Sequence, residues 1–246
     1  MGQHGEHGPL VRAAALAAAL VAWGGAAEAQ ATCRLALLLA LDISSSVDAQ
    51  EDALQRKGLA TALLAPEVQA AFLDGDLPVA LAVYEWSGRW VQETVLDWRL
   101  ITSETSLLEA AEVIAGSKRS YAEFPTALGY AMGHGATMLA EGPRCLFSTI
   151  DVSGDGENNE GFGPQAAYRE FPFAGVTVNG LVINGGDYEA EVSLIEYYRS
   201  EVLHGPGAFL EIANGFEDFE RAMRRKLERE ARPKTVGALP IDDTRG

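Results

Sequence analysis

Apolar and polar positions follow two different patterns along most of this chain. Runs that are apolar throughout, such as Leu35–Leu41, predict strands that are buried on both faces of a sheet. Segments with apolar residues every three or four positions predict helices that pack one face on a core. The expected strands cover about 35–41, 79–86, 90–98, 145–152, 176–183 and 208–212, and the expected helices cover about 47–65, 106–115, 127–139, 164–170, 188–202 and 216–230.

The order of these elements predicts a sheet that is mostly parallel. The link Ser87–Arg89 is short enough to make strands 79–86 and 90–98 an antiparallel hairpin, whereas helices separate most of the other strands. We therefore predict an α/β fold with a doubly wound, mostly parallel, six-stranded sheet and one antiparallel edge strand. Ligands of such sheets bind beyond the carboxyl ends of the strands, where Asp42 follows the first strand.

The first 29 residues have the pattern of a signal peptide. Arg12 precedes an apolar run, and Ala27 and Ala29 form an A-x-A cleavage site. An apolar N-terminal helix of the fold is the alternative. No later run reaches the length of a transmembrane helix. We predict signal peptide 1–29, one domain over 30–231 and a flexible tail 232–246, in a periplasmic or secreted protein that does not insert into a membrane.

Charge and cysteines narrow the choice of partners. The chain has 35 acidic and 19 basic side chains, a net charge of −16, which disfavours nucleic acid and anionic membranes. Cys33 and Cys145 favour a disulfide in an oxidising compartment, with two buried thiols as the alternative. Zinc is disfavoured because only His134 and His204 could join the cysteines, and none has ligand spacing. We expect both histidines to be structural or surface residues.

Oxygen ligands recur at three places that the predicted sheet brings to one end. Asp42, Ser44 and Ser46 follow the first strand, Thr126 opens a helix, and Asp155 follows the fourth strand. Carboxylates and hydroxyls suit Mg²⁺ or Mn²⁺, which are hard ions. A helix cap is the competing explanation for the serines. Asp48 followed by Glu51 predicts a capping box and takes that role itself.

These segments carry a resemblance. One resemblance is to the metal-ion-dependent adhesion site of von Willebrand factor A-type domains, carried by LDISSSVD, the later Thr126 and GDGENN. Another is to an uncharacterised bacterial family with that domain, carried by WSG, IDVSGDGENNEG, VNGLVI and YYRSEVLHGPGAF. The resemblance implies that Asp42, Ser44 and Ser46 form a first metal loop, Thr126 a second and Asp155 a third. It also implies an exported, non-enzymatic, metal-dependent protein-binding module, which we expect to be a monomer, whose ion binds an Asp or Glu of a partner.

Asp151 competes with Asp155 for the third loop. Cys33 precedes Asp42 by nine residues and Cys145 precedes Asp155 by ten, so parallel pairing of the first and fourth strands puts both cysteines at one depth. If Asp151 were the ligand at the end of the fourth strand, the two cysteines would be offset by roughly 10 Å of strand. The chain departs from the commoner family pattern at Ser45 and at Phe124-Pro125, which stand where small residues are usual.

Other functions fit less well. GDGENN also resembles a motif of haloacid-dehalogenase-like Mg²⁺ phosphatases, but position 44 lacks the aspartate that serves as general acid. A serine hydrolase is disfavoured because no G-x-S-x-G elbow occurs. A structural domain without physiological metal remains an alternative. We expect Trp86, Trp90 and Trp98 to pack rather than to contact a ligand, and the basic run 224–226 to face solvent. Asn158 and Asn159 are expected to form a turn beside Gly161, with a place at the rim of the metal site as the alternative.

Overall fold

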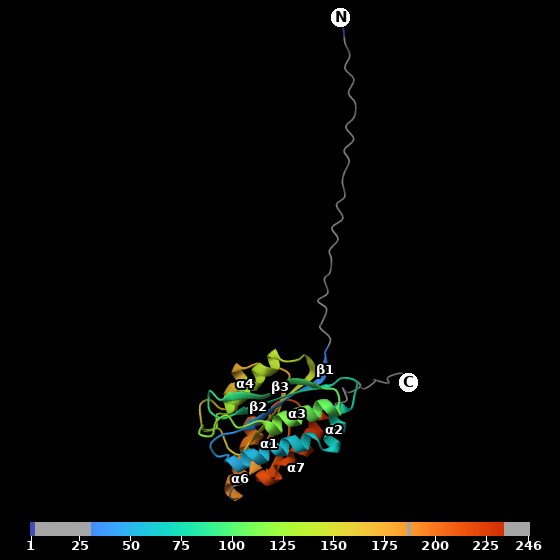
Figure 1. The fold of residues 1–246 in the computed structure, drawn as a ribbon. Helices are drawn as coiled ribbons and strands as arrows, with labels where there is room; N and C mark the ends of the chain where they lie inside the picture. Colours follow the sequence, from blue (N-terminus) through green and yellow to red (C-terminus); the bar gives the residue numbers. More distant parts are fainter. Residues whose placement is uncertain (3–30, 186–187, 234–246) are drawn as a thin grey trace, which may run out of the picture. The chain divides into compact units, whose positions relative to one another are not determined.

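Six strands form one sheet in the order β3-β2-β1-β4-β5-β6 (Figure 1). The computed structural model describes residues 1–2, 31–185 and 188–233, so the predicted signal peptide and most of the predicted tail lie outside the described residues. Only β3 is antiparallel to its neighbour. The predicted sheet is therefore confirmed. Its strands are β1 (Cys33–Asp42), β2 (Val79–Trp86), β3 (Gln92–Ile101), β4 (Cys145–Gly154), β5 (Val176–Asn184) and β6 (Leu210–Asn214).

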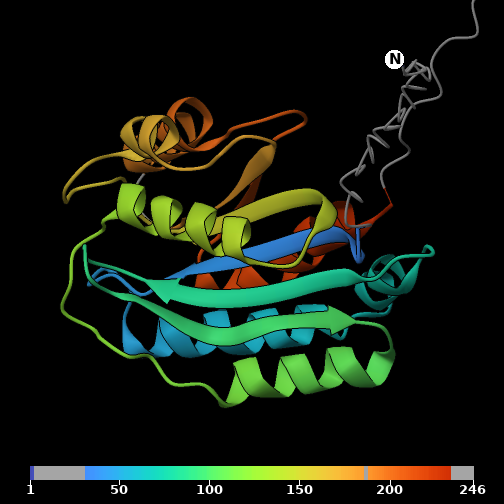
Figure 2. The same ribbon diagram turned by 90° about the horizontal axis from the view of Figure 1, so that it is seen from above.

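Helices cover both faces of the sheet (Figure 2). One face packs on α1, α2, α3 and α7, and the other packs on α4, α5 and α6. The helices are α1 (Ala49–Leu63), α2 (Pro66–Leu73), α3 (Glu104–Gly116), α4 (Leu128–Glu141), α5 (Pro164–Glu170), α6 (Tyr188–Tyr197) and α7 (Phe219–Ala231), with a π-helical turn η1 (Tyr198–Val202) and a 3₁₀ turn η2 (Phe216–Asp218). The sequence analysis missed α2, where Pro66 occupies the favoured first helical position.

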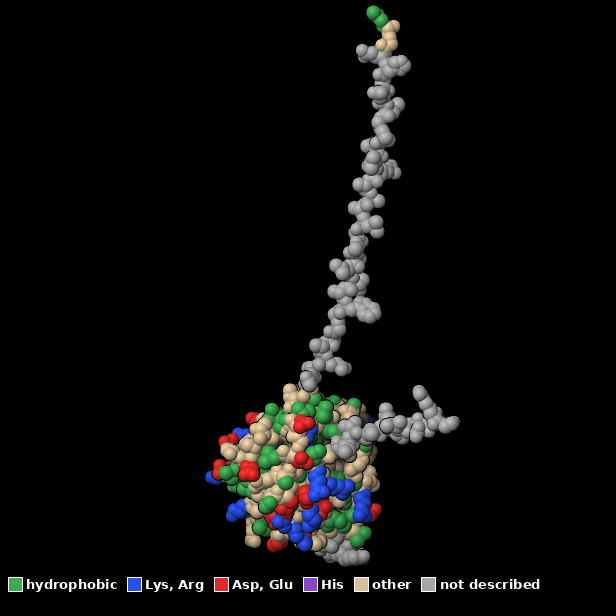
Figure 3. Space-filling model, turned by 90° about the vertical axis from the view of Figure 1, so that its right-hand side faces the viewer, with side chains coloured by type: hydrophobic (Ala, Val, Ile, Leu, Met, Phe, Trp, Pro, Cys, Tyr) green, Lys and Arg blue, Asp and Glu red, His purple; other side chains and the backbone are tan. Residues whose placement is uncertain are grey.

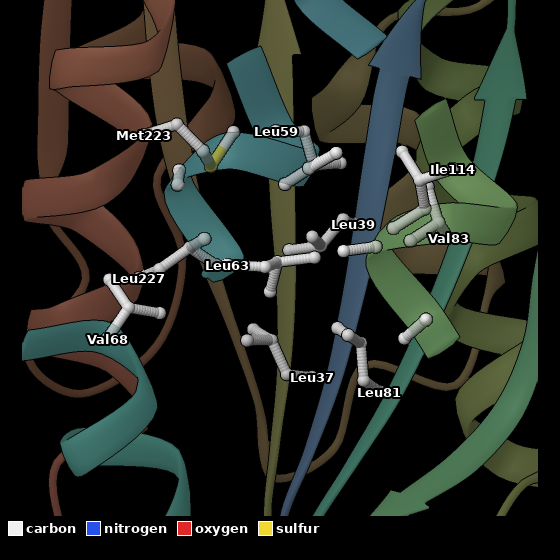
Figure 4. Close-up of a cluster of buried hydrophobic side chains, with 14 of the residues drawn as sticks. Leu37, Leu39, Leu59, Leu63, Val68, Leu81, Val83, Ile114, Met223 and Leu227 are labelled. Carbon is white, nitrogen blue, oxygen red and sulfur yellow. The ribbon is translucent and has the colours of Figure 1, made fainter. Parts of the chain in front are cut away.

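β1 is the centre of the core because all ten of its residues are buried. Leu37 and Leu39 lie on the face of the sheet that packs against Leu59 and Leu63 of α1 (Figure 4). Ala36, Leu38 and Ala40 point to the other face, which packs on α4. Period-two alternation of side chains thus divides one apolar strand between two cores. Burial of each leucine contributes about 1.5–3 kcal/mol.

The register of β1 and β4 confirms the predicted disulfide. Cys33 pairs directly with Cys145, and the two are bonded with their Cα atoms 4.5 Å apart. The bond lies at the amino ends of both strands. It therefore joins the first and fourth strands at the edge opposite Asp42.

Two predictions about side-chain exposure are wrong. Trp90 precedes β3 and is 89% exposed, so it does not pack inside, whereas Trp86 is fully buried. Lys226 is also fully buried, although the run 224–226 was expected to face solvent. The amphipathic period of α7 explains Lys226, since it places this residue on the inner face beside Met223 and Leu227.

Several basic side chains at the surface of α7 are paired with acids. Arg224 lies 3.4 Å from Glu67 of α2 and 3.7 Å from Glu220, and Arg225 pairs with Glu211 of β6. Figure 3 shows Lys and Arg interspersed with Asp and Glu on the face it presents. Basic residues in this acidic chain thus balance local charge, as expected for a solvated surface.

Candidate metal centre

The first loop begins where β1 ends. Asp42 is fully buried, and its Oδ1 accepts a 2.7 Å hydrogen bond from the backbone N–H of Ser44. Ser44 Oγ lies 3.1 Å from Ser46 Oγ. Asp48 then caps α1 and forms the predicted capping box with Glu51. The serines are thus left free of the capping role that competed for them.

The third loop reaches the first through Asp155. This residue follows the end of β4, and its Oδ1 accepts a 2.7 Å hydrogen bond from Ser46 Oγ. A Cβ added at the preceding residue, Gly154, would lie 2.9 Å from Asp42 Oδ2. The first and third loops therefore meet side chain to side chain.

Backbone contacts attach the second loop to both of the others. The N–H of Ser45 donates to the carbonyl of Phe124, with a distance of 2.8 Å. The N–H of Thr126 donates to Asn159 Oδ1 at 2.9 Å, and the N–H of Asn159 donates to the carbonyl of Thr126 at 3.0 Å. Thr126 is 3% exposed, and its Oγ1 lies 3.5 Å from where a Cβ of Gly156 would be.

The asparagines contact the second loop and the start of α4. Asn158 Oδ1 accepts from the N–H of Gly129 at 3.3 Å, while Asn159 contacts Thr126 as above. Both amides therefore hold the third loop against the start of α4. The spacing of GDGENN indicated a turn, but only the fold shows which loop the turn contacts.

The acidic groups of Asp42 and Asp155 repel each other in this centre. Burial, followed by the charge of Asp155, raises the pKa of Asp42 to about 8, against hydrogen bonds from Ser44 and the charge of Arg119. Burial also raises the pKa of Asp155. Asp42 Oδ2 is buried and has no hydrogen-bond partner within the described part of the chain. A bound cation would satisfy that oxygen.

Arg119 is a positive charge close enough to lower the pKa values of Asp42 and Asp155, and the sequence analysis missed it. Its guanidinium donates to the carbonyls of Ile43, Ser44 and Val47 at 2.6–2.8 Å. The arginine thus fixes the backbone of the first loop rather than pairing with a carboxylate. Nothing in the sequence around position 119 distinguishes it from a surface arginine.

Asp151 lies elsewhere. It pairs with Leu39 inside the sheet, and its Oδ1 is 3.0 Å from Nζ of the buried Lys226. Lys226 also contacts Glu230, which accepts a hydrogen bond from Asn179. The structure therefore brings Asp155, and not Asp151, to the end of β1.

The histidines make structural contacts away from the centre. His134 contacts the ring of Tyr84, with 5.1 Å between ring centroids, and His204 stacks on Tyr168 at 4.3 Å. A cavity of about 240 Å³ beside Arg34, Leu77 and Phe147 lies at the amino ends of the strands, away from Asp42. Neither feature offers a rival site for the chemistry of the three loops.

The donor set fits a hard divalent cation. It combines the carboxylates of Asp42 and Asp155 with the hydroxyls of Ser44, Ser46 and Thr126. Mg²⁺ and Mn²⁺ prefer such oxygen ligands. Across residues 31–185 and 188–233, no cluster holds three or more His, Cys, Asp or Glu side chains in a metal-binding arrangement. Any ion here must therefore rely on hydroxyl groups as well as carboxylates.

The fold is that of von Willebrand factor A-type domains. The chain belongs to the family described as "Protein of unknown function (DUF1194)", whose profile matches residues 32–235. No curated protein matches this chain. The predicted resemblance to an uncharacterised family with this domain is thereby confirmed.

Three solved structures with the same fold illustrate the similarity, and the descriptions of two of them mention a bound metal or adhesion. Proximal thread matrix protein 1 from the mussel byssus, with a zinc-occupied MIDAS motif, has a TM-score of 0.57 and 18% identity over 82% of this chain and 49% of its own. A von Willebrand factor type A protein from Catenulispora acidiphila has a TM-score of 0.57 and 16% identity, over 81% of this chain and 43% of its own. The pilus adhesin SpaC from Lactobacillus rhamnosus GG has a TM-score of 0.56 and 11% identity, over 82% of this chain and 31% of its own.

These comparisons establish the fold alone, because every identity is low. The chain spans about half or less of the length of these proteins. No helix among the described residues is long and apolar enough to cross a membrane.

Proposed function

We propose that this protein is an exported protein-binding module that uses a divalent cation, Mg²⁺ or Mn²⁺, to bind a carboxylate of its partner. Asp42, Ser44, Ser46, Thr126 and Asp155 would hold the ion. The observation that carries the proposal is the buried, unpartnered Oδ2 of Asp42 beside a second carboxylate, among the residues that the structure describes. A cation would relieve both the repulsion and the missing contact.

The hydroxyl ligands favour binding of an acidic partner. Ser and Thr hydroxyls are neutral, weak ligands, so the ion would keep affinity for a further carboxylate. The bound ion would supply an open coordination position, and an Asp or Glu of the partner would complete its coordination sphere. Two proteins with the same fold support this proposal. SpaC is a pilus adhesin, and proximal thread matrix protein 1 has a zinc-occupied MIDAS motif.

An exposed aromatic residue lies at the same end of the sheet. Trp86 pairs with Asp42 across β2 and β1, so the following turn, which carries Trp90, emerges beside the first metal loop. Trp90 is 89% exposed, and tryptophan is frequent among residues that dominate binding energy at protein interfaces. Trp90 would then contact the partner next to the ion.

Calorimetric titration with Mn²⁺ tests the metal site. We expect wild-type protein to bind the ion and Asp42→Ala to lose that binding while it keeps its fold. Asp97→Ala is the matched control, because Asp97 is an exposed carboxylate on β3. Equal Mn²⁺ affinity of wild type and Asp42→Ala would contradict the site.

Affinity capture from the native extract tests the binding function. A partner retained by wild type in Mn²⁺, and lost both in chelator and with Asp42→Ala, would support the proposal. Equal capture in chelator would contradict it. Trp90→Ala should weaken capture without changing Mn²⁺ affinity.

An aryl phosphate assay separates this function from that of a phosphatase. We expect no Mg²⁺-dependent turnover, because Ser44 cannot act as the general acid. Turnover that Asp42→Ala abolishes would overturn the binding function. A melting temperature that millimolar Mg²⁺ and Mn²⁺ leave unchanged would instead favour a structural domain without metal.

A further inference from the structure

Tyr198 is a buried residue whose hydroxyl no element of the fold uses. It is fully buried, and its Oη has no hydrogen-bond partner within residues 31–185 and 188–233. Buried tyrosine hydroxyls are usually paired, as Tyr84 is with the carbonyl of Ala131 at 2.8 Å. The unpaired state of Tyr198 therefore needs an explanation.

The hydroxyl of Tyr198 faces the metal centre. A Cβ added at Gly154 would lie 2.5 Å from Tyr198 Oη and 2.9 Å from Asp42 Oδ2, so both oxygens border the same small space. Asp42 Oδ2 is the other buried oxygen there that lacks a partner in the described structure. A hydroxyl can donate and an ionised carboxylate can only accept, so the two groups are complementary.

Two glycines make room for this tyrosine along the sheet. A Cβ at Gly180 of β5 would lie 3.0 Å from Cδ1 of the Tyr198 ring, and a Cβ at Gly154 of β4 would meet the hydroxyl. Val152 pairs with Gly180 and Gly154 pairs with Val182, so both glycines lie on one face of neighbouring strands. Glycine inside a strand costs stability and often marks a close approach by another group. Here the ring crosses β5 and the hydroxyl reaches the end of β4.

The helix that carries Tyr198 changes geometry at this residue. α6 ends at Tyr197, and the π-helical turn η1 begins at Tyr198. Such turns occur often at functional sites. Tyr197 contacts the third loop itself, since its Oη accepts a 3.3 Å hydrogen bond from the N–H of Asn158. Consecutive tyrosines thus reach the metal loops from one turn.

We propose that Tyr198 is a positioning residue of the metal centre, whose hydroxyl donates, directly or through one water, to Asp42 Oδ2 and holds that carboxylate for the cation. The role rests on the proposed function. Ligating carboxylates commonly accept hydrogen bonds from a second layer of residues, whose loss weakens metal affinity by about 10–100-fold.

Mn²⁺ titration of Tyr198→Phe tests the assignment, with Tyr84→Phe as the matched control. Both variants lose one buried hydroxyl and keep the ring. We expect Tyr198→Phe to bind Mn²⁺ at least about tenfold more weakly and Tyr84→Phe to bind it as wild type does. Unchanged affinity of Tyr198→Phe would overturn the role of Tyr198 and leave the proposed function standing. A wild-type chain that binds no Mn²⁺ would overturn both.

Urea unfolding in chelator gives a readout without metal. If Tyr198 contacts Asp42, Tyr198→Phe should lower the urea midpoint of the wild-type chain and should not lower it in an Asp42→Ala background. Equal shifts in the two backgrounds would contradict the contact. This comparison of the wild-type and Asp42→Ala backgrounds does not require either of them to bind an ion.

Discussion

Ser46 Oγ donates a 2.7 Å hydrogen bond to Asp155 Oδ1 across a separation of 109 positions in the chain. The contact joins the loop after β1 to the loop after β4. These strands are neighbours in the sheet and run parallel, so their carboxyl ends meet at one edge. The hydrogen bond thereby holds the loop after β1 against the loop after β4.

Removal of the Ser46 hydroxyl should weaken metal binding. We expect Ser46→Ala to reduce Mn²⁺ affinity by about tenfold or more, because it removes a ligand and frees Asp155 to turn away. Ser45→Ala is the control, since the side chain of Ser45 is exposed and its backbone N–H makes the loop contact. Isothermal titration calorimetry measures both. Equal losses in the two variants would mean that the loop, rather than the hydroxyl, matters.

The metal-free protein should be less stable at pH 8 than at pH 5. Burial and the charge of Asp155 raise the pKa of Asp42 from 3.8 to about 8, so between these values the folded state binds a proton that the unfolded state does not. Stability then falls as pH rises, by up to about 1.4 kcal/mol per pH unit for one proton.

Urea unfolding in chelator across this range checks the dependence. Asp42→Asn should reduce the slope, whereas Asp97→Asn should not. Saturating Mn²⁺ should remove the loss at pH 8, because the ion binds the ionised carboxylate. Stability that rises from pH 5 to pH 8 in chelator would contradict the environment assigned to Asp42.

Loss of the disulfide should lower stability and leave the metal site intact. The bond closes a sequence separation of 112, for which chain entropy predicts a contribution of about 2–5 kcal/mol. Cys33→Ser/Cys145→Ser should therefore melt several degrees lower. Its Mn²⁺ affinity should match that of wild type, since the cysteines pair at the amino ends of β1 and β4. A large loss of affinity would show that the two ends of the sheet are coupled.

Truncation of Lys226 should be costly although it lies in a basic run. Its Nζ is 3.0 Å from Asp151 and 2.7 Å from Glu230, and all three side chains are buried. Lys226→Met leaves both carboxylates without a cation, which should cost about 3–5 kcal/mol. The loss should be smaller at pH 5 than at pH 8, because burial raises the pKa of Asp151 and favours its protonated form at the lower pH.

Arg224→Met is the matched control for Lys226, because Arg224 is partly exposed at 37% and its ion pairs are long. Its expected effect is within about 0.5 kcal/mol. Chemical denaturation at both pH values measures the two variants. Similar stabilities would contradict the burial of Lys226.

The sequence by itself determined the order of strands and helices along the chain, the antiparallel hairpin, the cap at Asp48 and the first-loop spacing of Asp42, Ser44 and Ser46. Each of these depends on local periodicity or on residues a few positions apart, which the printed chain displays directly. Only the tertiary structure buried Lys226, exposed Trp90 and brought Arg119 and Tyr198 to the loops, whereas the cysteine spacing already favoured Asp155 over Asp151. Those outcomes depend on which strands pair, in which register, and on which face of a helix meets the sheet, and distant parts of the chain decide them together.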